Sequence, residues 1–186
     1  MRHSYIIRKA EEKDLPQIES LQRANLARNV DDAQKEKEGF VSVETDLPLL
    51  SQINRDIGIL VAKADDKLVG YEMPLGLEHA AQIPLLDPFI KRFTQLDYEE
   101  RKIRDSRWVI EGQICVSRDY KGLGISEELH KHFIDMLKGR YDLIITEISD
   151  QNPKSLHVHT KKLGMKVCDQ YHAEGRNWFV LMQDIR

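Results

Sequence analysis

The stretch VSRDYKGLGISEELHKH at residues 116–132 decides how the rest of the chain is interpreted. It follows an apolar, strand-like run that ends at Val116, and after two glycines Leu129, Phe133 and Leu137 recur at helical spacing. A strand, a glycine turn and a helix start in this order leave backbone N–H groups directed at one point, with the positive end of the helix dipole behind them. The pattern predicts an anion site, most simply for a phosphate or pyrophosphate.

Gly122 and Gly124 suit such a site, because a backbone without a Cβ can approach a phosphate closely and adopts positive φ without strain. Lys121 adds a cation at the rim. A plain tight connection between strand and helix is the alternative. The stretch has neither the G-x-x-x-x-G-K-[ST] pattern nor the third glycine of a dinucleotide fingerprint, which disfavours P-loop and Rossmann sites.

The bulk properties favour one soluble globular domain over residues 1–186, of which 41% are hydrophobic and 32% charged. A net charge of −3 and a pI of about 6.2 predict neither nucleic acid nor an acidic membrane surface as a partner. The apolar runs are strand-sized and the N-terminus is charged, so we expect a cytoplasmic protein. Cys115 and Cys168 are too few for a disulfide framework, and we expect both to be buried free thiols.

Apolar runs predict seven strands, at residues 5–9, 57–64, 67–75, 107–116, 141–148, 166–171 and 178–182. Helical spacing predicts helices near 15–29, 47–53, 123–137 and 153–163, and residues 96–103 have room for a further short helix. Asp14 is the expected N-cap of the first helix. The polar residues 29–38 are expected to form a solvated loop or a frayed helix.

The long strand before the glycine turn carries a carboxylate, Glu111, in an otherwise apolar run. Burying a carboxylate without a partner is costly, so Glu111 is either functional or part of a structural ion pair or an edge position. Unless a bulge intervenes, alternation places Glu111, Gln113 and Cys115 on one face and Ile110, Ile114 and Val116 on the other.

The last helix has a well-marked start at Asn152-Pro153 and a glycine, Gly164, just past its end. Within it, His157 and His159 lie on different faces, which disfavours a chelating pair. The chain has no Cys/His metal pattern, and we expect no bound metal.

The glycine loop resembles the acyl-coenzyme A loop of the GNAT N-acetyltransferase superfamily, whose pattern is [R/Q]-x-x-G-x-[G/A]. Lys121 stands at the Arg/Gln position, Gly124 at the central glycine and Ser126 at the final Gly/Ala. The opening segment, with Arg8, Ala10 and Asp14, and the N-P-x-S…L-G-M segment at residues 152–165 also resemble the family. The resemblance covers nearly the whole chain.

The resemblance implies an α/β (α+β) fold, with a mixed twisted sheet of about six to seven strands flanked by about four helices. It implies that acetyl-CoA lies where the sheet splays, with its pyrophosphate on residues 121–126. The residues expected to bind the cofactor are Ile114, Cys115, Val116, Lys121, Gly122, Leu123, Gly124, Ile125, Ser126, Asn152 and Ser155.

The implied reaction is direct transfer of an acetyl group to a primary amine of a small molecule or peptide. Glu111 is the candidate base and His159 the candidate acid for the leaving thiolate, with main-chain N–H groups near Cys115 and Val116 at the thioester carbonyl. One extra residue before Gly164 leaves Thr160 as an alternative to His159.

Residues 30–55 are a candidate wall for the acceptor, with Phe40 either in contact with substrate or a packing residue. Residues 78–105 are the second candidate wall, or a dimer contact if the protein is a homodimer. The main alternative function is a non-catalytic protein of this fold that binds acyl-CoA as a sensor.

Overall fold

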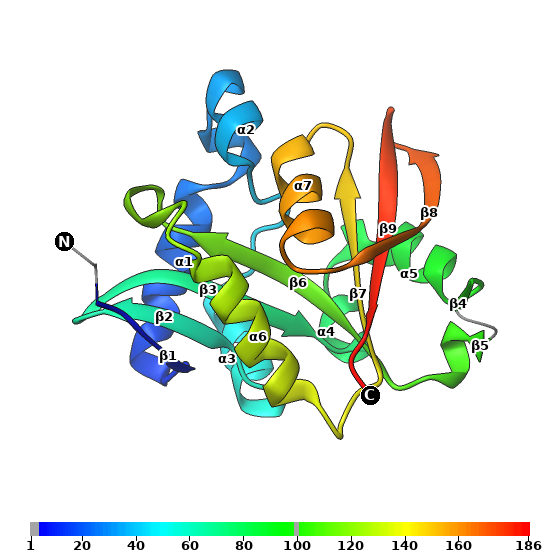
Figure 1. The fold of residues 1–186 in the computed structure, drawn as a ribbon, viewed down its shortest axis with the longest axis horizontal. Helices are drawn as coiled ribbons and strands as arrows, with labels where there is room; N and C mark the ends of the chain where they lie inside the picture. Colours follow the sequence, from blue (N-terminus) through cyan, green and yellow to red (C-terminus); the bar gives the residue numbers. More distant parts are fainter. Residues whose placement is uncertain (1–3, 99–100) are drawn as a thin grey trace.

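The computed structural model describes residues 4–98 and 101–186 and contains a mixed seven-stranded sheet in the order β1-β2-β3-β6-β7-β9-β8 (Figure 1). The strands are β1 (Ile6–Lys9), β2 (Leu60–Ala64), β3 (Lys67–Leu75), β6 (Trp108–Val116), β7 (Leu143–Ser149), β8 (Lys166–Ala173) and β9 (Arg176–Asp184). All neighbours pair antiparallel except β6 and β7, which are parallel. The seven strands predicted from the sequence are all present.

The described residues form seven α-helices: α1 (Leu15–Ala24), α2 (Asp32–Glu38), α3 (Leu47–Asp56), α4 (Leu77–Ala80), α5 (Asp87–Phe93), α6 (Ile125–Leu137) and α7 (Pro153–Lys161). The four longest, α1, α3, α6 and α7, are those that apolar spacing predicted. The other three are short and lie in the polar or proline-rich segments, where spacing carries little information. None of the helices in this part of the chain is long and apolar enough to span a membrane.

The prediction of a helix within residues 96–103 is wrong for the residues described there. The two-residue strands β4 (Asp97–Tyr98) and β5 (Arg101–Lys102) pair with each other instead, while residues 99 and 100 lie outside the described residues. The helix of this region is α5, which starts upstream with Pro88 in its first turn, where a missing N–H costs nothing.

Helices cover both faces of the sheet (Figure 1). On one face, α1, α3 and α5 pack their apolar residues against the sheet, with Ile18, Leu50, Ile53, Phe89 and Phe93 almost completely buried. On the other face, α6 buries Ile125, Leu129, Phe133 and Leu137. Each such side chain contributes roughly 1.5–3 kcal/mol by leaving water. The apolar spacing in residues 116–137 thus fixes α6 against the strand that leads into it.

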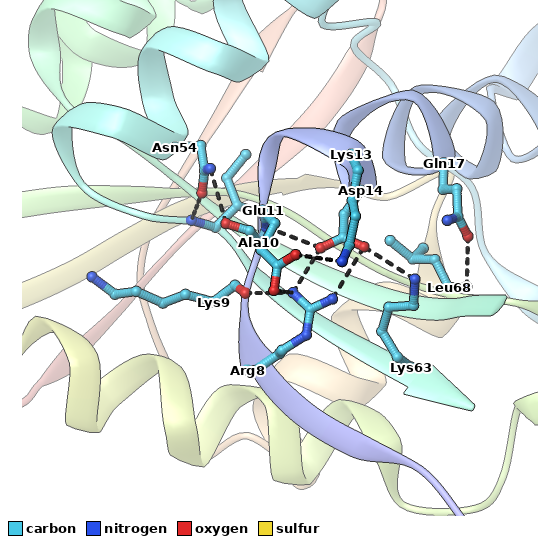
Figure 2. A network of polar contacts seen from close by, with 11 residues as sticks. Arg8, Lys9, Ala10, Glu11, Lys13, Asp14, Gln17, Asn54, Lys63 and Leu68 are labelled. Carbon is cyan, nitrogen blue, oxygen red and sulfur yellow. Dashed lines mark hydrogen bonds and ion pairs between the residues drawn. The ribbon is translucent and has the colours of Figure 1, made fainter. Parts of the chain in front are cut away.

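Asp14 occupies the N-cap position of α1 as expected, but its side chain makes no capping hydrogen bond to the helix and forms ion pairs instead (Figure 2). Its carboxylate accepts hydrogen bonds from Arg8 Nη1 at 2.7 Å, from Lys63 Nζ at 3.0 Å and from the backbone N–H of Glu11 at 2.9 Å. Asp14 has no exposed surface. The network ties β1, the start of α1 and β2 together.

The turns of the sheet use positive φ, and the expectation for the two cysteines is confirmed in part. The hairpins at Asp65 and Glu174 have φ of 51° and 53°, and Gly164 has φ of 81° just past α7. Cys115 is buried as expected, whereas Cys168 is exposed. The expectation for Cys168 is wrong because β8 is the edge strand of the sheet and its outer surface is uncovered.

Candidate active site

The sheet opens between its two parallel strands. β6 and β7 pair only from Trp108 to Ile110 and from Leu143 to Ile145, after which the strands diverge toward their carboxyl ends (Figure 1). Two cavities lie along this opening. The sequence-predicted site residues line these cavities, with the exception of Leu123, which is exposed and lines neither.

The smaller cavity, here called the gap cavity, has a volume of about 110 Å³. Its walls include Glu111 and Gln113 of β6, Glu147 of β7 and Trp178 of β9. Apolar residues of the proline-rich segment, among them Leu86, complete it. The larger cavity, here called the loop cavity, has a volume of about 390 Å³ and lies along the glycine loop.

The two cavities share a boundary, formed by five residues that line both of them: Phe40, Val41, Ile114, Ser155 and His159. Phe40, a candidate for substrate contact on sequence grounds, therefore stands at the junction, where both cavities meet. A group entering from the glycine loop and a group entering the gap cavity would meet at this boundary.

A β-bulge at Gly112 decides where Glu111 points. The β3–β6 register shifts between Met73↔Gln113 and Pro74↔Glu111, which leaves Gly112 without a partner. Regular alternation would have put Glu111 on the face of Gln113 and Cys115, but the bulge reverses this. Gln113 lies on the α1 face, whereas Glu111 contacts α7. The register needs glycine here, because a Cβ on Gly112 would lie 2.7 Å from Leu75 Cγ.

Gln113 has a structural role that the sequence did not indicate. Its Oε1 accepts hydrogen bonds from Gln22 Nε2 at 2.9 Å and from the Tyr71 hydroxyl at 2.7 Å, and its Nε2 donates to the Val43 carbonyl at 2.5 Å. Gln113 thereby joins β6 to α1, to β3 and to the segment that follows α2.

Glu111 and His159 form a buried pair at the junction. Glu111 Oε2 lies 3.2 Å from His159 Nε2, and the side chains are 1% and 6% exposed. His159 Nδ1 lies 2.7 Å from the Ser155 carbonyl, which fixes Nδ1 as a donor. Burial raises the pKa of Glu111, but the facing His159, together with His130 and Glu72, outweighs burial and lowers that pKa below its ordinary value. Burial likewise lowers the pKa of His159, but the facing Glu111 outweighs burial and raises that pKa above its ordinary value.

Of the polar side chains in the middle of α7, only His159 turns toward the cavities. Thr160 turns its hydroxyl back to the Leu156 carbonyl at 2.7 Å, and His157 is exposed. His159 alone among these three lines both cavities.

The glycine loop provides an open cradle for an anion. Gly122 and Gly124 have φ of 80° and 81°, and a Cβ built on either would meet nothing within 4 Å. The first hydrogen bond of α6 runs from Glu128 N to Gly124 O, so the amides of residues 125–127 are not used within the helix. Positive φ and the free helix start fit a pyrophosphate, and side chains at either glycine would occupy the space that it needs.

Three of the cations that line the loop cavity are already paired. Lys121 Nζ lies 3.2 Å from Glu38 Oε2 and 3.1 Å from the Glu38 carbonyl, and Arg118 contacts the same carboxylate at 3.2 Å. Lys162 pairs with Glu127 at 2.9 Å. Glu38 at the end of α2 therefore holds Lys121 at the edge of the cradle.

Asn152 and Ser155 hold the start of α7. Asn152 accepts from Ser155 N at 3.3 Å, as predicted for an N-cap, and its Nδ2 donates to the Phe40 carbonyl at 2.9 Å. Asn152 lines the gap cavity and Ser155 lines both cavities. Asn152 thus anchors the segment after α2 across the junction.

The β3–β6 ladder orients the main-chain donors of β6. Ser117 N donates to Val69 O at 2.8 Å, so alternation turns the Cys115 N–H toward β3 and the N–H groups of Ile114 and Val116 toward the opening. Burial raises the pKa of the Cys115 thiol to about 12, which makes Cys115 a poor nucleophile.

Sequence comparison adds a family to this geometry. The model of the acetyltransferase (GNAT) family matches residues 26–165. None of the curated proteins compared with the chain matches it at a significant level.

Three solved structures share the fold. The ribosomal-protein-S18-alanine N-acetyltransferase of Escherichia coli aligns with a TM-score of 0.62 at 12% identity, over 98% of this chain and 94% of its own. The protein yncA of Salmonella typhimurium, solved with its cofactor acetyl-CoA, aligns with a TM-score of 0.64 at 15% identity, over 98% and 94%. The ribosomal-protein-alanine N-acetyltransferase of Brucella melitensis gives 0.61 at 19% identity, over 96% and 99%. At these identities the similarity concerns the fold.

Proposed function

The chain belongs to the acetyltransferase (GNAT) family, and we propose that it transfers an acetyl group from acetyl-CoA directly to a primary amine. It is an acyltransferase, and its family uses acetyl-CoA as the donor. The acceptor and the roles of individual residues are our proposal. The observation that carries it is the Glu111–His159 pair at the boundary of the two cavities.

The loop cavity is the proposed donor site. Gly122, Gly124 and the amides at the start of α6 would hold the pyrophosphate, with Lys121 beside it. The N–H groups of Ile114 and Val116, turned toward the opening, would stabilise negative charge on the carbonyl oxygen of the acetyl group. Acetyl-CoA supplies the activated acyl group.

The gap cavity is the proposed acceptor site, and Glu111 is its base. Two protons leave the acceptor nitrogen during the reaction, of which one ends on the cofactor sulfur and one reaches solvent. Glu111 accepts a proton from the amine, and His159, which lines both cavities, donates one to the sulfur. The contact of 3.2 Å between them lets Glu111 pass its proton to the imidazole and restores the charged pair.

The acceptor we propose is a small molecule or a peptide that presents a narrow amine-bearing end. The gap cavity is small, and its charged or titratable lining consists of Glu111, Glu147 and His159, with apolar side chains around them. A protein that only senses acyl-CoA has no use for a buried base facing this cavity. We therefore favour the enzyme over the sensor.

The first experiment tests the donor site by thermal unfolding with acetyl-CoA, CoA and ATP. We expect the two CoA species to raise Tm and ATP to have no such effect. Gly124→Asp places a carboxylate in the cradle and should abolish the shift. Gly139→Asp is the matched control, because Gly139 also has φ of 80° with open space but lies outside both cavities. If millimolar CoA leaves the Tm of the wild type unchanged, the proposed donor site is wrong.

The second experiment tests the base with a panel of amines and free-thiol detection of CoA. Glu111→Gln should lower kcat by about 10²–10⁴-fold while the Tm shift with CoA persists. An unchanged kcat in Glu111→Gln would remove the proposed base. A wild type that binds CoA but acetylates no amine in the panel would favour the sensor.

A further inference from the structure

A second buried carboxylate–imidazole pair, Glu72 and His130, lies next to the proposed base, and the sequence analysis did not single it out. Glu72 on β3 has no exposed surface, and its Oε1 lies 2.7 Å from Nδ1 of His130 on α6. His130 Nε2 lies 2.7 Å from Oε1 of Gln183, whose own Nε2 donates to the Leu163 carbonyl at 3.2 Å. Both ring nitrogens of His130 therefore face acceptors, which fits an imidazolium.

Three carboxylate oxygens in this region are left without hydrogen bonds. Oε2 of Glu72 and both oxygens of Glu111 are buried, and none has a well-aligned donor, although Glu111 contacts His159 as an ion pair. Glu72, Glu111 and His130 each present one polar atom within 4.8 Å of the others. Buried carboxylate oxygens without donors are costly, and two neighbouring carboxylates favour keeping a proton on one of them.

We propose that Glu72 is a positioning residue that carries a proton on Oε2 and donates it in a hydrogen bond to Glu111. This inference rests on the proposed function in taking Glu111 as the base. The proton stays bonded to Oε2 of Glu72 and forms a hydrogen bond to an oxygen of Glu111. No other bond forms or breaks. The terminal torsion of a glutamate is broad, and the Glu111 carboxyl makes no hydrogen bond, so its rotation can direct an oxygen toward Glu72 while Oε1 of Glu72 stays on His130. Glu111 is thereby held as an oriented carboxylate.

The surroundings favour the proton on Glu72. The titratable side chains that face Glu72 are His130 of α6, Glu111 of β6 and His159 of α7, while β2 places Leu60 opposite it. Burial raises the pKa of Glu72 to about 7, with His130 opposing and Glu111 adding to the rise. The pKa of Glu111 is lowered, because His159, with His130 and a hydrogen bond from Glu72 adding to its effect, outweighs burial. Glu72 is therefore the weaker acid of the two.

The same three groups, Glu72, Glu111 and His130, offer donor atoms of the kind that bind divalent metals. Both nitrogens of His130 already face oxygen atoms, however, so His130 could bind an ion only by giving up one of these contacts. Proton sharing therefore fits the observed contacts better than metal binding does.

Two variants at Glu72 distinguish a side chain that donates a hydrogen bond from one that only fills space. Glu72→Gln keeps an oxygen for His130 and supplies an amide N–H to Glu111 at every pH. Glu72→Leu fills similar space without a donor. We expect Glu72→Leu to lower kcat about 10–100-fold, with Glu72→Gln restoring most of the loss. The ratio of wild-type to Glu72→Gln kcat should stay constant below pH 6 and fall above pH 7, as Glu72 loses its proton. The Tm shift with CoA shows that each variant is folded.

The pH dependence of Tm requires no catalysis, so it tests this inference independently of the proposed function. Because Glu72 in the folded protein binds a proton that the unfolded chain releases near pH 4.5, wild-type Tm should fall relative to Glu72→Gln between about pH 4.5 and 7. A pH-independent difference in Tm overturns the proposal even if the protein acetylates no amine. Equal kcat in the Leu and Gln variants, or stoichiometric metal in the purified wild type that Glu72→Gln loses, also overturns it.

Discussion

Asp14→Asn tests the buried ion-pair network that joins β1, α1 and β2. The carboxylate of Asp14 is inaccessible to solvent and contacts both Arg8 and Lys63, whose side chains are 27% and 6% exposed (Figure 2). The asparagine has nearly the same shape and keeps an oxygen for the Glu11 N–H. It removes only the negative charge, which leaves the ammonium of Lys63 buried without its partner.

The pKa of Asp14 sets the size of the effect. Burial opposes ionisation, but the hydrogen bonds from Arg8, the Glu11 amide and Lys63 outweigh it and lower the pKa from 3.8 to about 2. At 1.36 kcal/mol per unit this difference stabilises the folded state by about 2 kcal/mol at neutral pH. The uncompensated charge of Lys63 adds to the loss, so we expect Asp14→Asn to cost about 2–4 kcal/mol.

The assay is urea unfolding of both proteins at a series of pH values. Because the pKa is depressed in the folded state, the stabilisation is present above about pH 4 and is lost as pH falls toward 2. The difference between wild type and Asp14→Asn should therefore shrink from pH 7 to pH 3. Asp32→Asn is the control, because the Asp32 side chain pairs with Lys35 but is 98% exposed. This variant should change the free energy of unfolding by less than about 0.5 kcal/mol. A loss at pH 7 no larger than that of the control would refute the reasoning.

Three further predictions follow from the site. Gly112→Ala should destabilise the protein by about 1–3 kcal/mol in urea unfolding, because a Cβ at the bulge has no room. The variant should also lower kcat more than it lowers CoA affinity, and equal losses of kcat and CoA affinity would contradict the role of the bulge. Glu38→Gln should tighten CoA binding severalfold in calorimetry at low salt, since it releases Lys121 from a competing carboxylate; weaker binding would mean that Glu38 chiefly positions that lysine. A thiol reagent should label Cys168 in the native protein and Cys115 only after unfolding, as mass spectrometry of digested protein would reveal.

The sequence by itself determined the elements that depend on local contacts. Apolar spacing located α6, the cap at Asn152 located α7, and positive-φ glycines located the cradle, because each of these depends on residues close together in the chain. The order of strands and helices then limited the fold to a mixed sheet. The resemblance of residues 121–126 to an acyl-coenzyme A loop rests on the same local pattern.

Only the tertiary structure decided how side chains from distant segments meet. A single unpaired residue, Gly112, reverses the face on which Glu111 lies. Strand alternation cannot anticipate this bulge, where a Cβ on Gly112 would collide with Leu75 of another strand. Asp14 looked like a cap because capping is local, yet a lysine 49 residues away competes for its carboxylate. Glu72 and His130 are 58 residues apart, and no pattern in the chain links them, because a hydrogen bond between side chains depends on distance in space and not on spacing in sequence.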